Sequence, residues 1–133
     1  MIGSVAYLDS SAFVKLVVAE PESEALRRAL ARWPDQVSST LLRTETVRAL
    51  RRSGNELHLA AARSLLRTVH MIRVDEPLLD RAGDLGPPDL RTLDSIHLAA
   101  ALALSDEVGV MFVYDARLRK AAAACGIEVA SPA

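Results

Sequence analysis

Four acidic residues occupy positions where their carboxylates could take part in chemistry. Asp9 and Asp115 each directly follow an apolar run and directly precede a helical pattern. Glu45 lies in the middle of another helical pattern, on or beside its apolar stripe, and Asp94 stands in the first turn of an almost wholly apolar segment. Because ligands bind at the carboxyl ends of strands in open α/β sheets, we expect all four to share one pocket at that edge.

Carboxylates gathered in one pocket repel one another, and their pKa values rise unless a cation neutralises them. Oxygen ligands favour Mg²⁺ or Mn²⁺, whereas zinc prefers nitrogen and sulfur. Such an ion can activate a water molecule and stabilise the leaving oxygen in phosphodiester cleavage. The spacing therefore predicts a divalent-metal site, with phosphoester chemistry as the favoured reaction.

Each carboxylate also has a purely structural interpretation. Asp9 and Asp115 are of a residue type favoured as helix N-caps, and Asp94 would be stabilised by the dipole of its helix. Glu45 could pair with an arginine, since an unpaired buried charge is very costly.

Two hydroxyl residues and one histidine are further candidates. Ser10 or Ser11 is expected to cap the first helix, and Ser10 could instead donate a hydrogen bond to a metal ligand or a phosphate. Thr92 is expected to cap the helix that contains Asp94, with a possible contact to the site. His97 is expected to be a packed core residue, because the sequence lacks the paired-histidine spacing of zinc helices.

Charge and composition narrow the classes of protein that are possible. The chain has 16 basic and 17 acidic residues, which argues against a simple basic nucleic-acid-binding module. Arginine is nevertheless the dominant cation, and its guanidinium suits phosphate contacts. A cluster of possible RNA contacts, or else a solvated helix face, comprises Arg43, Arg48, Arg51 and Arg52.

The elements that must position these residues alternate along the chain. Strands are expected over residues 5–8, 36–38, 71–74 and 110–114, with a possible last strand over 127–129. Helices are expected after residue 9 and over residues 24–32, 41–52, 56–70, 92–104 and 115–124, with a short one from residue 75. This alternation, without a hairpin signal, predicts an α/β sandwich around a parallel sheet.

The length of 133 residues indicates one domain. The N-terminus lacks a secretory pattern, and the apolar runs are too short for a membrane span. Cys125 follows four alanines and is expected to pack as a small hydrophobic residue. A cytoplasmic protein is the expectation.

Four segments together resemble the PIN-domain ribonucleases, and more narrowly the VapC-type toxins of bacterial toxin–antitoxin pairs. They are residues 7–16 (YLDSSAFVKL), Glu45 after a Ser-Ser pair, residues 90–99 (LRTLDSIHLA) and residues 113–118 (VYDARL). The resemblance covers nearly the whole chain. It implies a three-layer sandwich with a short, mostly parallel sheet, and an acidic quartet of Asp9, Glu45, Asp94 and Asp115 that coordinates Mg²⁺ or Mn²⁺.

The resemblance also implies endonucleolytic cleavage of RNA by a metal-bound water, a cognate antitoxin that covers the toxin, and frequent dimerisation. Two alternatives stay open. One is a non-catalytic PIN-like module that binds RNA or protein. The other is a phosphotransfer enzyme with Asp9 as nucleophile, which is disfavoured because dehalogenase-like phosphatases need a second aspartate where this chain has Ser11.

Overall fold

The computed structural model describes residues 2–133, apart from the side chain of Ser105. Its sheet contains β1 (Val5–Leu8), β2 (Asp35–Ser39), β3 (His70–Ile72), β4 (Val108–Phe112) and β5 (Val129–Ala130). The strands lie in the order β3-β2-β1-β4-β5, and each neighbouring pair is parallel. The expected parallel α/β sheet is therefore confirmed, and all five strands end at the same edge.

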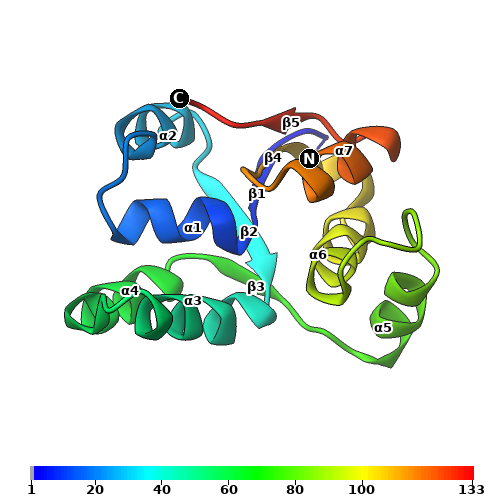
Figure 1. The fold of residues 1–133 in the computed structure, drawn as a ribbon. Helices are drawn as coiled ribbons and strands as arrows, with labels where there is room; N and C mark the ends of the chain where they lie inside the picture. The colour runs from blue at the N-terminus through cyan, green and yellow to red at the C-terminus, as the bar shows by residue number, and fades with distance from the viewer. Residues whose placement is uncertain (1) are drawn as a thin grey trace.

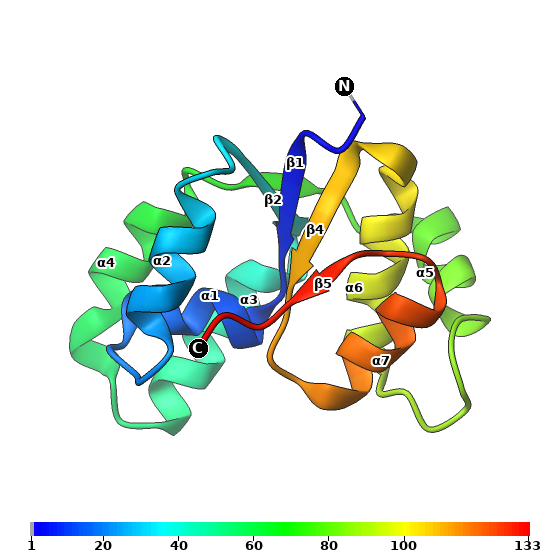
Figure 2. The ribbon, with the colours of Figure 1, turned by 90° about the horizontal axis from the view of Figure 1, so that it is seen from above.

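Helices cover both faces of this sheet (Figures 1 and 2). One layer contains α1 (Ser10–Val17), α2 (Ser23–Leu30), α3 (Leu41–Arg52) and α4 (Leu59–Leu66). The other contains α5 (Glu76–Gly83), α6 (Thr92–Ala103) and α7 (Ala116–Ala124). The three-layer sandwich is thus confirmed. Among the described residues, none of these helices is long and apolar enough to cross a bilayer.

The core consists of two apolar layers, one on each side of the sheet. Side chains alternate between the two faces of a strand, so Ala6 and Leu8 of β1 pack toward α1, α2 and α3. Tyr7, between them, packs into the other layer with α6 and α7. A parallel sheet buried on both faces needs apolar residues at nearly every position, as β1 has.

The fourth helix is shorter than its sequence pattern predicts. Instead of one helix over residues 56–70, the chain forms a 3-10 turn (Glu56–His58), then α4, and then enters β3 at His70. Thr68 turns its hydroxyl back to the carbonyl of Leu65 at 2.7 Å, where the helix ends. Leu57, in the 3-10 turn, is 81% exposed. Pairing of β3 with β2 overrides the local helical pattern.

Two smaller expectations at the C-terminal end are also wrong. Strand β4 begins at Val108 and ends at Phe112, two residues earlier than expected, because its pairing with β1 begins at Val5 and Val108. Cys125 is exposed rather than packed. It lies beyond the last residue of α7, at the C-cap, and therefore off the helix face that contacts the sheet.

Candidate active site

An open cavity of about 730 Å³ lies at the carboxyl edge of the sheet. All four predicted acidic residues line it. Asp9 directly follows β1, and Asp115 comes shortly after β4, while Glu45 projects from α3 and Asp94 from the first turn of α6. The structure therefore places residues that are up to 106 positions apart in the chain around one cavity, as the sequence predicted.

Asp9 is the most deeply buried of the four, with 2% of its surface exposed. It is the N-cap of α1, because its side chain accepts a hydrogen bond from the backbone N–H of Ala12 at 3.0 Å. The expectation that Ser10 or Ser11 caps this helix is wrong for that reason. The capping interpretation of Asp9 is confirmed, and its second oxygen makes no backbone contact of this kind.

Ser11 holds the carboxylate of Asp9 in place. Its hydroxyl lies 2.7 and 2.8 Å from the two carboxylate oxygens and accepts from the backbone N–H of Tyr114 at 2.9 Å. This one hydroxyl links α1 to the segment after β4. Burial raises the pKa of Asp9 to about 6, and the hydrogen bond from Ser11 opposes that rise.

Asp94 and Asp115 share one internal cation. The Nε of Arg91 lies 3.0 Å from Asp94 Oδ2, and its Nη2 lies 2.8 Å from Asp115 Oδ2. The hydrogen bond to Asp94 contributes most to raising the pKa of Arg91. Asp115 also accepts from the backbone N–H of Leu118 at 2.9 Å, which confirms its N-cap role for α7. Sequence reasoning did not assign Arg91, although its spacing to Asp94 is that of helical neighbours.

Glu45 is paired with a histidine, not with an arginine. His97 Nε2 lies 2.6 Å from Glu45 Oε1, and Ser10 donates its hydroxyl to Oε2 at 3.3 Å. The other ring nitrogen of His97 lies 2.7 Å from the hydroxyl of Tyr7, which is fully buried. Since the carboxylate can only accept, the His97 ring donates from Nε2, and the Tyr7 hydroxyl is the hydrogen-bond partner of Nδ1.

His97 is thus a core residue, as predicted, but one that fixes a site carboxylate. It is 1% exposed and lies edge-on to the ring of Tyr7. A polar ring in so apolar a helix must find hydrogen-bond partners. This requirement is the feature of the sequence that indicates a buried, hydrogen-bonded role for His97. The identity of those partners, 52 and 90 residues away, could not be deduced from spacing.

The carboxylates are held apart by these internal partners. Across the described residues 2–133, no three His, Cys, Asp or Glu side chains converge in a way that could hold a metal ion. Asp9 is turned to Ser11, Glu45 to His97, and the other two carboxylates to Arg91. The cavity therefore has the predicted acidic composition, and each of the four carboxylates already has a hydrogen-bond partner within the chain.

The remaining candidates divide between separate surfaces. Arg48 and Arg52 line the acidic cavity, whereas Arg43 lines a neighbouring groove and Arg51 lines neither. Thr92 lines another cavity, next to the segment between α5 and α6. The expectation that Thr92 caps α6 is wrong, because it is the first helical residue and the preceding arginine occupies the N-cap position.

The sequence is similar to a known protein family and to several of its members. The PIN domain family model matches residues 6–124. Ribonuclease VapC46 of Mycobacterium tuberculosis is 49% identical over 95% of this chain and 96% of its own length, and Ribonuclease VapC47 of the same organism is 38% identical with the same coverage.

A solved structure has the same fold. The crystal structure of M. tuberculosis VapC20, described as a Sarcin-Ricin loop cleaving toxin, matches with a TM-score of 0.78 at 17% identity, over 96% of this chain and 99% of that one. The chain belongs to the PIN domain family and, within it, resembles the VapC ribonucleases along nearly its whole length.

Proposed function

We propose that this chain is a Mg²⁺-dependent endoribonuclease that acts as the toxin of a VapBC-type toxin–antitoxin pair. The observation that carries the proposal is that Asp9, Glu45, Asp94 and Asp115 all line one cavity at the carboxyl edge of the sheet. Two related proteins are named as ribonucleases, and these names support RNA cleavage as the reaction.

The donor set fits a hard divalent cation. Every acidic group lining the cavity offers carboxylate oxygen, which Mg²⁺ and Mn²⁺ prefer. A guanidinium already bridges Asp94 and Asp115, which shows that these two carboxylates can share a positive charge. Asp9 and Asp94 would be the principal ligands, with Glu45 and Asp115 completing the set.

When bound, the metal would activate a water molecule and stabilise the leaving oxygen of the phosphodiester. The residues of the chain position the site for that chemistry. Ser11 fixes the two oxygens of Asp9, and His97 fixes Glu45. Ser10 donates to the second oxygen of Glu45 and lies where it can also face a phosphate. Arg91 would compete with a bound cation for Asp94 and Asp115.

The proposed partners follow from the toxin role. A cognate antitoxin of the VapB type would cover the acidic cavity and keep it inactive, and RNA would be the substrate in the cytoplasm. We also propose a homodimer, as is frequent in the family that this chain resembles.

The decisive experiment is cleavage of total cellular RNA by the purified chain with Mg²⁺, Mn²⁺ or EDTA. Asp94→Asn provides the control for contaminating nuclease, because it removes one proposed ligand and keeps the shape of the side chain. We expect discrete fragments that disappear with chelator and with the substitution. Equal behaviour of both proteins over many RNAs and metals would contradict the proposal and favour a non-catalytic PIN-like binding module.

A further inference from the structure

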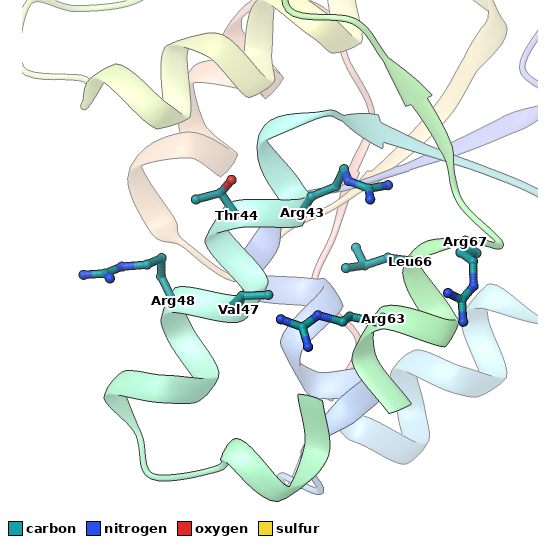
Figure 3. A pocket seen from close by; sticks show the side chains of 7 residues that line it. All are labelled: Arg43, Thr44, Val47, Arg48, Arg63, Leu66 and Arg67. Carbon is teal, nitrogen blue, oxygen red and sulfur yellow. The ribbon is translucent and has the colours of Figure 1, made fainter. Parts of the chain in front are cut away.

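A second surface, next to the acidic cavity, gathers arginine side chains in a groove between α3 and α4. The groove has a volume of about 400 Å³. Figure 3 shows Arg43 and Arg63 reaching into the space between the helices from opposite walls, with Val47 and Leu66 between them. Its full lining is Arg43, Thr44, Val47, Arg48, Arg63, Leu66 and Arg67. We name this surface the arginine groove.

The charges of the arginine groove are not neutralised by the chain. Its four arginines are exposed, and none of them forms a salt bridge with an acidic residue in the part of the chain that the structure describes. Arg67 makes one hydrogen bond, of 3.4 Å, to the hydroxyl of Ser64. Like charges held this close repel one another, so an anionic ligand would relieve the repulsion.

The arginine groove is continuous with the acidic cavity. Thr44 and Arg48 line both, and Figure 3 shows Arg48 pointing away from α4, toward the side opposite Arg67. A strand of nucleic acid with one phosphate at the carboxylates would therefore carry its neighbouring phosphates past Arg48 toward α4.

The chemistry of the lining favours phosphate over a protein partner. The guanidinium group is planar and matches phosphate in a bidentate manner, and positively charged grooves track the backbone of single strands. An amphipathic partner helix would need an apolar floor. Here the apolar residues of the lining are Val47 and Leu66, and Leu66 is only 4% exposed.

We propose that the arginine groove binds the phosphodiester backbone of the RNA strand next to the bond that is cut. This inference rests on the proposed ribonuclease function and adds Arg63 and Arg67 of α4 to the arginines predicted from the sequence. The contacts carry no base specificity, because they are made to phosphates.

The test measures binding of a short fluorescein-labelled single-stranded RNA by anisotropy, in EDTA and over a series of salt concentrations. For single strands, the slope of log K against log salt is about −0.7 per neutralised phosphate, so each lost contact lowers K about 5-fold at 0.1 M salt. The double variant Arg63→Gln/Arg67→Gln should therefore bind about 25-fold more weakly, with a slope reduced by about 1.4.

Arg81→Gln is the control for the loss of a positive charge outside the groove. Arg81 is exposed on α5, in the other helical layer, and lines neither the groove nor the acidic cavity. We expect this variant to bind RNA nearly as the parent does. For cleavage in Mg²⁺, we expect the double groove variant to raise KM far more than it lowers kcat.

An RNA affinity and salt slope of the double variant equal to those of Arg81→Gln would overturn the inference. If the same variant instead weakened the complex with the antitoxin and left RNA binding unchanged, the groove would belong to a protein partner and the inference would fail. Failure of the ribonuclease proposal is distinguishable, because the parent chain would then bind RNA without cutting it.

Discussion

The burial of Asp9 makes the free energy of unfolding depend on pH in an unusual direction. Because the pKa of Asp9 rises from 3.8 to about 6 on folding, mainly through desolvation, folding favours the protonated form. Below pH ~4 the group is protonated in both states and costs nothing. Above pH ~6 it is ionised in both, and the folded state bears the full cost of a buried charge. The stability of the metal-free protein should therefore fall as pH rises through this window.

The size of this change in stability follows from the pKa shift of Asp9. A difference of about 2 pKa units at about 1.4 kcal/mol per unit corresponds to about 3 kcal/mol. Asp9→Asn removes the titration and keeps a carbonyl oxygen that can accept from the backbone N–H of Ala12. Between pH ~4 and ~7, the free energy of unfolding of this variant should rise by up to about 3 kcal/mol relative to that of the parent. The variant should also lose RNA cleavage.

Urea unfolding of both proteins in EDTA at several pH values measures this difference. Asp75→Asn is the matched control, because Asp75 caps α5 through the backbone N–H of Leu78 in the same manner but is exposed. Its difference from the parent should remain small across the pH range. Addition of Mg²⁺ should stabilise the parent through linkage and leave Asp9→Asn almost unchanged.

A constant difference between Asp9→Asn and the parent from pH ~4 to ~7 would refute the reasoning. It would mean that the carboxylate is solvated in solution or that its partners compensate its charge completely. A difference that falls as pH rises would reverse the sign and would show that hydrogen bonding, mainly from Ser11, outweighs burial.

Three further substitutions probe other parts of the molecule. Tyr7→Phe removes the buried hydroxyl that is hydrogen-bonded to His97, so we expect the free energy of unfolding in urea to fall by about 1–3 kcal/mol and the kcat of RNA cleavage to fall as well. An unchanged kcat would contradict a role of Tyr7 in positioning His97 and Glu45. Arg91→Gln removes the cation that bridges two site carboxylates, so Mg²⁺ should bind several-fold more tightly, as measured by calorimetry. Weaker Mg²⁺ binding would contradict competition between Arg91 and the metal ion for these carboxylates. Gly109→Ala should cost about 1–3 kcal/mol in thermal unfolding, because a Cβ there would lie 2.5 Å from both the backbone oxygen of Gly3 and a ring carbon of Trp33. An unchanged melting temperature would show that both the ring and the backbone at Gly3 can move.

The sequence was sufficient for those parts of the site that depend on local rules. Asp9 and Asp115 follow β1 and β4, and carboxyl ends of parallel strands must meet at one edge. Asp94 could be placed because a carboxylate in an otherwise largely apolar helix is conspicuous. The parallel sheet followed from alternating strands and helices in the same way.

Other features depend on tertiary contacts that leave no local pattern. The partner of Glu45 is His97, 52 residues along the chain, and an arginine was an equally reasonable expectation. The arginine groove exists because α4 packs beside α3, which brings Arg63 and Arg67 toward Arg43. The boundary of α4 was misplaced for a related reason, since pairing of β3 with β2 ends the helix.

The two surfaces have opposite charge, and this separates their roles in binding. Without a divalent cation, the carboxylates of the acidic cavity repel a phosphate, so the arginine groove should hold the RNA alone. Mg²⁺ should therefore increase the RNA affinity of a chain that is prevented from cutting, for example with a substrate that lacks the attacked bond. That gain should disappear in Asp94→Asn and persist in Arg63→Gln/Arg67→Gln, measured by anisotropy. A gain lost equally in both variants would show that the cavity and the groove act as one site.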